Sequence, residues 1–370
     1  MKRVHLVIPD LFLPKDFAAE VCAGLRLPAL ERMLGRGHCE TLELVPLENL
    51  LCEMFGVPCQ ADAPIASISA AFDGLGAGCW LRADPVHLRL QRDQMLLLPN
   101  MEISAGEAGQ MCASLNGHFA GQGMEFFVPH PLRWYVRLDT LPRIHNRPLS
   151  QVIGGDVRGA LPTGEEAARW HQVFNEIQML LFAHPLNESR EARGALPINS
   201  VWFWGGGCDT LLAEPADCGN SRQAAPAVPE EDTVASWGGG SSLMGLSQKS
   251  YDNVSSDEVL VEMFAAAAEI PFSGWPMQWR DEENIVEQLL VWTGLRSALQ
   301  RGDLAAWSVA LQNFESGYAQ PLWQALSSGK IARLQIDILG VDNIRRVLLT
   351  RGDAWTFWRR AKRLAEYSIV

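Results

Sequence analysis

The sequence predicts an α/β fold, and three patterns along the chain lead to this expectation. Residues 4–9 (VHLVIP) form a continuous apolar run, which is typical of a strand that is covered on both faces. Apolar residues with helical spacing follow at 30–36 and again at 47–55, and strand-like runs return after them. Strands that alternate with helices favour a sheet flanked by helices over an all-helical bundle.

The first elements have recognisable ends. The helix at 30–36 stops before Gly37 and the helix at 47–55 stops before Gly56. A glycine just past a helix readily takes the backbone angles that end it. A short strand at 78–81 is expected after this second helix.

Two capping boxes predict where longer helices begin. In this motif a Ser or Thr precedes a Glu by three residues, so that each side chain bonds the backbone N–H of the other. Ser104 with Glu107 predicts a helix that runs to residue 119, and Thr163 with Glu166 predicts one that runs to residue 182. Further strands are expected at 125–128, 134–138, 200–204, 234–237, 331–339 and 347–350, and further helices at 257–268 and 303–326.

Composition indicates a globular protein and argues against several classes of function. Hydrophobic residues make up 48% and charged residues 20% of the 370 residues, a balance that allows a sizeable core in two to three domains. The net charge of −12 disfavours nucleic-acid binding, which needs clustered basic residues. No apolar run reaches the roughly 18 residues of a membrane span. Because Asp10 interrupts the first apolar run, we interpret it as a buried strand and not as a signal peptide.

The cysteine pattern favours free thiols in a reducing cytoplasm. The eight cysteines contain no C-x-x-C pair and no zinc-like grouping with histidine, and they lie at positions 22, 39, 52, 59, 79, 112, 208 and 218. Two other segments have a compositional interpretation. Residues 213–232, rich in Pro, Ala and acidic residues, are expected to be a linker. The segment 238–245 (GGGSSLMG) lacks the Lys-Ser/Thr of a nucleotide-binding loop, so ATP binding is not expected.

A polar segment at 175–207 is the main functional signal. Its centre, 184–199 (HPLNESREARGALPIN), is dense in side chains that bind anions and is followed by a strand ending in three glycines. Arginine can hold a phosphate or carboxylate with two parallel hydrogen bonds, and asparagine adds neutral directional donors. The segment therefore predicts an anion-binding region.

This segment resembles the archaeal-type, cofactor-independent phosphoglycerate mutases of the alkaline-phosphatase superfamily. Residues 28–37, 76–89 and 133–157 resemble, in turn, the early helix, an arginine-containing strand and the inserted domain of that family. The chain is also similar to a bacterial branch described as regulatory proteins of the pathogenicity-factor type. The resemblance implies an alkaline-phosphatase-like sheet flanked by helices, with an inserted α/β domain. The core would consist of residues 1–75 and 195–370, and the insert, which binds substrate, of residues 76–194.

The resemblance also implies a chemistry that this sequence lacks the residues to complete. Such mutases use a covalent serine intermediate and two divalent metals, here Mn or Mg, held by Asp and His ligands. Asp10 matches the first metal ligand, and Leu47 stands where the serine is expected. All eight histidines lie at or before residue 184, whereas the family places most of its histidine ligands later. We therefore interpret Asp10 as a vestigial ligand and expect a ligand-binding or regulatory protein that needs no cofactor.

The ligand expected from this interpretation is a small phosphorylated or carboxylated molecule. Its predicted contacts are seven polar residues: Arg82, Asp84, His87, His184, Asn187, Arg190 and Asn199. Two alternatives remain open. One is an active enzyme whose rearranged metal site uses Asp10, Asp84, His87 and His184, and the other is a structural or interaction protein without a ligand.

The C-terminal stretch 345–363 adds a separate hypothesis. It carries seven basic residues and one acidic residue in an otherwise acidic chain. With Asp353 as a cap, residues 355–364 would form a helix with one aromatic and one basic face. Such a helix packs on the core or binds a partner through residues 345–366.

Overall fold

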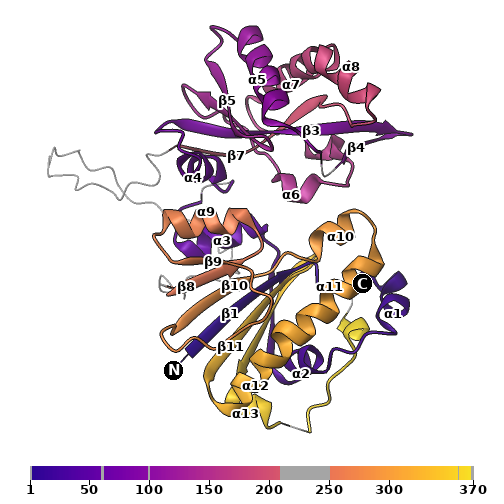
Figure 1. The fold of residues 1–370 in the computed structure, drawn as a ribbon, viewed down its shortest axis with the longest axis vertical. Helices are drawn as coiled ribbons and strands as arrows, with labels where there is room; N and C mark the ends of the chain where they lie inside the picture. The colour runs from indigo at the N-terminus through magenta and orange to yellow at the C-terminus, as the bar shows by residue number, and fades with distance from the viewer. Residues whose placement is uncertain (1, 60–61, 99–100, 209–250, 357, 368–370) are drawn as a thin grey trace, which may run out of the picture.

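Two sheets carry the fold of the computed structural model, one above the other in Figure 1. The structure describes residues 2–59, 62–98, 101–208, 251–356 and 358–367. The expected linker at 213–232, the strand at 234–237, the glycine segment at 238–245 and Cys218 lie outside these residues. The α/β class predicted from the sequence is confirmed, because both sheets are flanked by helices.

The larger sheet has seven strands in the order β2-β12-β11-β1-β10-β8-β9. Strand β1 lies near its centre and pairs in parallel with both β10 and β11. The strands are β1 (Lys2–Pro9), β2 (His38–Glu43), β8 (Asn253–Ser256), β9 (Phe272–Gly274), β10 (Glu287–Val291), β11 (Ile331–Leu339) and β12 (Asn343–Thr350). The carboxyl ends of β1, β8 and β10 therefore point to one edge, where α/β proteins bind their ligands.

Helices cover both faces of this sheet (Figure 1). One face carries α1 (Lys15–Cys22), α2 (Pro28–Arg36), α11 (Leu304–Phe314) and α12 (Gln320–Ser328), with a single π-helical turn at Glu315–Ala319 between the last two. The other face carries α3 (Leu47–Phe55) and α9 (Val259–Ala267). The short helices α10 (Arg296–Gln300) and α13 (Arg351–Ala354) follow β10 and β12.

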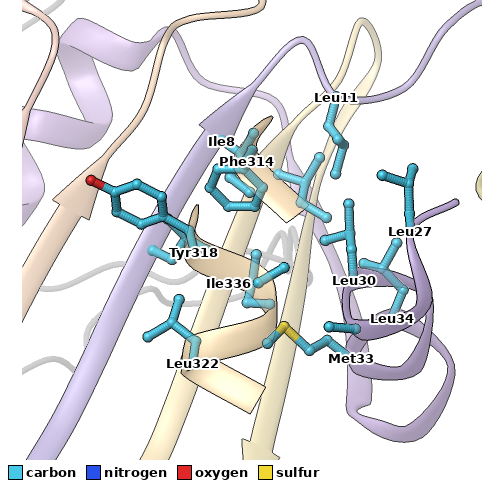
Figure 2. Packing of buried hydrophobic residues seen from close by; sticks show 14 of the residues in the cluster. Ile8, Leu11, Leu27, Leu30, Met33, Leu34, Phe314, Tyr318, Leu322 and Ile336 are labelled. Atoms are coloured by element: carbon cyan, nitrogen blue, oxygen red, sulfur yellow. The ribbon is translucent and has the colours of Figure 1, made fainter. Parts of the chain in front are cut away.

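Strand β1 shows why helices must cover both faces of the larger sheet. Leu6 and Ile8 belong to the cluster on the α2 side, whereas Val7 between them belongs to the cluster on the α3 side. Successive side chains of a strand point to opposite faces, so an unbroken apolar run buries both. Figure 2 shows Ile8 among side chains from α2 and from the α11–α12 segment, including Met33 and Phe314.

The smaller sheet has five strands, and helices pack on it as well. Its strands are β3 (Cys79–Gln91), β4 (Gln94–Leu98), β5 (Met124–His130), β6 (Arg133–Leu138) and β7 (Ser200–Cys208). Its helices are α4 (Ile65–Phe72), α5 (Ala105–His118), α6 (Leu149–Val152), α7 (Ala167–Phe182) and α8 (Pro185–Ala192). Strand β7 pairs with β3, so residues 200–208 lie in this sheet and not, as expected, in the larger one.

Several predicted helix ends are found where the sequence indicated. Gly56 ends α3 with a positive φ of 69°, which glycine adopts without strain. The Ser104–Glu107 capping box begins α5. The second predicted capping box is wrong, because α7 starts only at Ala167. Thr163 instead exchanges backbone hydrogen bonds with His145, a residue far away in the sequence.

The predicted amphipathic helix at 355–364 is also wrong. Helix α13 ends at Ala354, and its capping box uses Thr350 with Asp353. Trp355 and Trp358 are 65% and 67% exposed, whereas Leu364 is 3% exposed and packs on the core. A partner that binds residues 345–366 stays a prediction.

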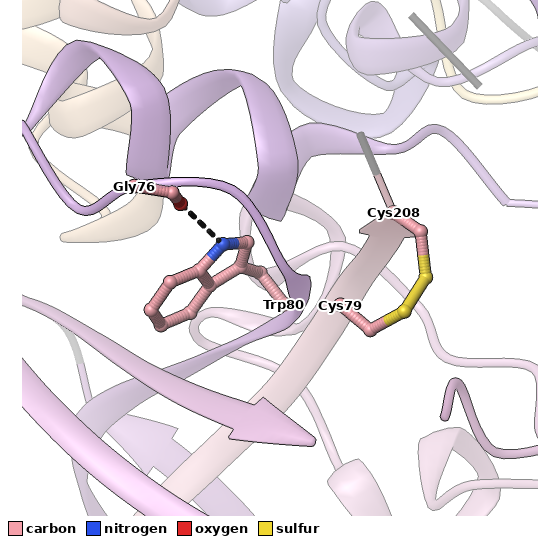
Figure 3. Close-up of a disulfide and its surroundings, with 4 residues drawn as sticks. All are labelled: Gly76, Cys79, Trp80 and Cys208. Carbon is pink, nitrogen blue, oxygen red and sulfur yellow. Dashed lines mark hydrogen bonds between the residues drawn. A yellow bond between two sulfur atoms is a disulfide. The ribbon is translucent and has the colours of Figure 1, made fainter. Parts of the chain in front are cut away.

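The expectation that all cysteines are free thiols is wrong for one pair. Cys79 at the start of β3 and Cys208 at the end of β7 form a disulfide, shown in Figure 3 beside Trp80. The bond closes a loop of 129 residues that contains the whole five-stranded sheet. Among the helices of the described residues, none is long and apolar enough to cross a membrane.

Candidate ligand-binding site

A cavity of about 420 Å³ lies between the two sheets, next to the carboxyl ends of β8 and β10. We call it the inter-sheet cavity. The helices and connections around the larger sheet contribute Glu48, Glu258, Thr293 and Arg296 to its wall, and the smaller sheet contributes Arg82, Asp84, His130 and Arg133. A larger opening of about 770 Å³ beside the disulfide has a wall rich in glycine and alanine, whereas three arginines, Arg82, Arg133 and Arg296, line the inter-sheet cavity.

Helix α3 places a carboxylate in the cavity wall. The apolar residues Leu47, Leu50 and Leu51 are buried, and Leu47, in the position where the resemblance implies a serine, lines the cavity. Glu48 is only 2% exposed, and its Oε1 accepts a hydrogen bond of 2.6 Å from Ser150 Oγ of α6. Its Oε2 is buried and has no hydrogen-bond partner in the part of the chain that the structure describes. The next serines along the chain after Leu47 are Ser67 and Ser69, and neither lines the cavity. Both donate a hydrogen bond to a backbone carbonyl at the start of α4.

Two more carboxylates stand where β8 ends and α9 begins. Asp257 accepts a hydrogen bond of 2.7 Å from the backbone N–H of Thr293, and Glu258 caps α9 by accepting from the N–H of Leu260. Desolvation by the surrounding protein raises the pKa of Asp257 and of Glu258 above the usual carboxyl value. Glu258 therefore adds a second carboxylate to the cavity wall beside Glu48, and no salt bridge among the described residues pairs either of them. Asp257 precedes Glu258 but does not line the cavity.

Strand β3 places Arg82 and Asp84 in the opposite wall, as a buried ion pair. Both are less than a tenth exposed, and Arg82 Nη2 donates to Asp84 Oδ1 at 2.7 Å. The Arg82 guanidinium lies 5.1 Å from the ring centre of Tyr135 and 5.2 Å from that of Trp204. Trp204 Nε1 donates to Asp84 Oδ2, so the pair is fixed from several sides. These contacts hold Arg82 at one orientation toward the cavity.

The turn between β5 and β6 adds two more basic side chains. Arg133 donates through Nε and Nη2 to Asp73 just beyond α4, at 2.9 and 2.7 Å. Tyr135 also donates to Asp73, and these donors outweigh the effect of burial and lower the pKa of this carboxyl. His130 lines the same wall, and burial lowers its pKa, so neutral imidazole is favoured there.

Arg296 at the start of α10 connects the cavity to Asp10. Its Nε donates to Asp10 Oδ2 at 3.1 Å, and Asp10 follows directly after β1 with a positive φ of 62°. The residues present do not fit the two-metal site that the resemblance implies. Asp10 already binds a guanidinium, and in the part of the chain that the structure describes, no three His, Cys, Asp or Glu side chains come together as a metal site. We therefore derive no reaction step through a metal.

The predicted contacts from the polar segment lie elsewhere, in the connection between α7 and β7. Asn187 is 4% exposed and bonds three backbone groups, the carbonyls of Leu181 and Ile198 and the N–H of Ile198. Arg190 is 1% exposed and donates to Glu107 at 2.8 Å. His184 caps α8. None of the three lines the inter-sheet cavity.

His87 and Asn199 likewise join β3 to the segment before β7. His87 Nδ1 bonds the carbonyl of Pro197, and Asn199 bonds both the N–H and the carbonyl of Leu88. Of the seven predicted ligand contacts, the structure thus brings only Arg82 and Asp84 to the cavity. The alternative metal set does not converge either, because no such group forms among the described residues.

The sequence patterns did not indicate Glu48, Arg133 or Arg296 as site residues. Glu48 had a usable signal, because it follows the position at which the resemblance implies a nucleophile. Arg296 lies five residues after β10, a parallel strand, and such connections carry ligand-binding groups in α/β sheets. Arg133 has no comparable local signal.

The fold and the cavity define a two-sheet α/β protein with a cavity between its sheets that charged side chains line in part. The chain is 37% identical over 200 residues to a protein of Geobacter sulfurreducens named as a probable 2,3-bisphosphoglycerate-independent phosphoglycerate mutase. It is 23% identical over 199 residues to the 2,3-bisphosphoglycerate-independent phosphoglycerate mutase 2 of Methanothermobacter thermautotrophicus. The aligned part is 49% of this chain in both comparisons, and 49% and 47% of the relatives, so the match spans about half of each curated relative.

Structural comparison supports the fold alone. The PH0037 protein of Pyrococcus horikoshii is similar with a TM-score of 0.55 and 11% identity, over 99% of this chain and 92% of that one. The cofactor-independent phosphoglycerate mutase of Thermoplasma acidophilum gives a TM-score of 0.47 at 12% identity, over 100% of this chain and 95% of that one. No family model matches the sequence. The chain is thus phosphoglycerate-mutase-like over about half of its length.

Proposed function

We propose that this mutase-like chain binds a small phosphorylated or carboxylated ligand in the inter-sheet cavity, without metal-dependent phosphoryl transfer. The proposal includes a regulatory role, as in the bacterial branch that the sequence resembles, and a cytoplasmic location, where the Cys79–Cys208 bond would meet reducing conditions. An active mutase would need a nucleophile at the start of α3, where Leu47 offers none.

The proposal rests on three arginines in the cavity wall whose guanidinium groups use only some of their N–H donors within the protein. Arg82 and Arg133 each use Nε and Nη2 on a carboxylate, and Arg296 uses Nε on Asp10. Their other Nη groups make no hydrogen bond to the described residues. A guanidinium fixed by one edge presents the other edge ready to hold an anion. Phosphate and carboxylate groups match this geometry.

Ligand binding is tested by thermal unfolding of the purified chain with 3-phosphoglycerate. A ligand that binds only the folded state raises the unfolding temperature. We expect this increase for the unsubstituted chain and a smaller one for Arg296→Gln. Arg301→Gln is the matched control, because Arg301 is exposed, lies just after α10 and does not line the cavity. An equal increase in both variants would place the ligand elsewhere.

Loss of catalysis is tested by an assay for interconversion of 2- and 3-phosphoglycerate with Mn or Mg added. We expect no turnover above the uncatalysed background. Turnover that a chelator abolishes would contradict this part of the proposal and favour the active-enzyme alternative. No increase in unfolding temperature with any phosphorylated or carboxylated probe would favour the interaction-protein alternative.

A further inference from the structure

The unpartnered oxygen of Glu48 is the feature of the cavity that the anion-binding proposal leaves unexplained. The residue is 2% exposed, and Ser150 satisfies only Oε1. Oε2 is buried, and no donor among the described residues reaches it. A buried carboxylate oxygen without a donor is strongly unfavourable, and native proteins rarely retain one without a reason.

The charges near Glu48 add to the energetic cost of leaving this oxygen without a donor. Glu258 lines the same wall, and its electrostatic environment includes both Glu48 and Asp257. Arg296, which lines the same cavity, forms its ion pair with Asp10. No salt bridge within the described ranges reaches Glu48 or Glu258. On the larger-sheet side of the cavity, Glu48 and Glu258 are therefore two carboxylates without a salt bridge among the described residues, and Arg296 on that side acts on Glu258 without forming an ion pair with it. Arg82 and Arg133 lie on the opposite side.

We propose that the ligand carries an ammonium group that bonds Glu48 Oε2, together with an anionic group that the arginines hold. This inference rests on the proposed function and adds the substrate class. The ligand is a phosphorylated amino acid or a related zwitterion, not a hydroxy acid. An ammonium supplies both the missing donor and the missing positive charge, whereas a hydroxyl supplies only the donor.

Two probes with the same carbon skeleton separate these classes. O-phosphoserine and 3-phosphoglycerate differ in having an ammonium or a hydroxyl group at the same carbon. We expect O-phosphoserine to bind the unsubstituted chain about tenfold more tightly, since a charge-assisted bond adds on the order of one tenfold step in affinity. Calorimetric titration of the full chain measures both dissociation constants.

The variant Glu48→Gln assigns the preference to this side chain. Glutamine keeps an oxygen for Ser150 but presents an amide N–H₂ in place of Oε2, so the preference for O-phosphoserine should disappear. Glu53→Gln is the matched control: it removes the same charge from an exposed position on the same helix and should keep the preference. If Glu48→Gln does not fold, the comparison of the two probes on the unsubstituted chain still decides the ligand class.

Each outcome has a distinct meaning. Equal affinity for the two probes overturns this inference and leaves the anion-binding proposal intact. A preference for O-phosphoserine that survives in Glu48→Gln overturns the role of Glu48. If neither probe binds, this inference fails, and thermal unfolding with the other phosphorylated and carboxylated probes decides the proposed function.

Discussion

The carboxylate of Asp10 and the guanidinium of Arg296 meet at the edge of the larger sheet, where Nε donates to Oδ2 at 3.1 Å. A metal ligand expected from the sequence is thus paired with a permanent cation. Arginine stays protonated at every pH that the protein survives, so it always competes with a metal ion for this carboxylate. The pair also anchors α10, and with it Arg296, beside the inter-sheet cavity.

This pairing predicts that divalent metals do not stabilise the protein. We expect MnCl₂, MgCl₂ and a chelator to leave the unfolding temperature unchanged, as measured by differential scanning calorimetry. Asp10→Asn serves as the control, because asparagine tolerates the positive φ of this position but binds metals poorly. An increase with Mn in the unsubstituted chain that is lost in Asp10→Asn would show a metal site at the end of β1.

The buried Arg82–Asp84 pair predicts a large cost when one partner is removed. Arg82→Ala leaves the carboxylate of Asp84 uncompensated at 2% exposure, which should reduce the free energy of unfolding by about 3–5 kcal/mol. Urea denaturation measures this loss. The exposed pair Arg137–Glu125 is the comparison, since Arg137→Ala should cost only about 0–1 kcal/mol. Equal losses would mean that burial does not govern the first pair.

The fold was largely predictable because its signals are local. The apolar run of β1, the glycine after α3 and the capping box of α5 each determine an element within a few residues. The failed prediction at Thr163 shows the limit of this reasoning. The backbone N–H and carbonyl of Thr163 pair with those of His145, so Thr163 does not cap the helix. No local pattern in the sequence reveals a partner at that distance.

The candidate site was less predictable because the sequence does not show which way a polar side chain points in the fold. Arg82 and Asp84 were predicted and do line the cavity. Asn187 and Arg190 have the same chemistry, but they bond backbone groups and Glu107, which lies 83 residues away from Arg190. Only the tertiary structure distinguishes an arginine that faces a ligand from one that holds a loop in place.

Glu107 predicts a pH dependence of stability that arises away from the cavity. Burial alone would raise its pKa, but bonds from Ser104, Arg193 and Arg190 outweigh this effect and lower the pKa to about 2 from an ordinary value of 4.5. A lowered carboxyl pKa stabilises the fold above the unfolded-state value, and this stabilisation is lost as the pH falls toward the folded-state value. We therefore expect this contribution in full above pH 4.5 and its loss between pH 4.5 and 2.

Glu107→Gln isolates this effect, because glutamine at this position preserves the capping box while it removes the charge. Urea denaturation between pH 2 and 7 should show a weaker pH dependence for the variant than for the unsubstituted chain. The exposed Glu176, which bonds His118, provides the control variant Glu176→Gln. Identical pH profiles for all three proteins would show that the arginines do not stabilise the Glu107 carboxylate.

The Cys79–Cys208 disulfide predicts that the smaller sheet depends on oxidation. Closing a loop of 129 residues restricts the unfolded chain, and for loops near this length the entropic gain is roughly 4–5 kcal/mol. We expect dithiothreitol, or the Cys79→Ser variant, to lower the free energy of unfolding measured with urea. Cys39→Ser is the control, because Cys39 is exposed and free and its loss should change little. If reduction leaves the unfolding midpoint unchanged, the antiparallel pairing of β3 with β7 holds the sheet closed without the bond.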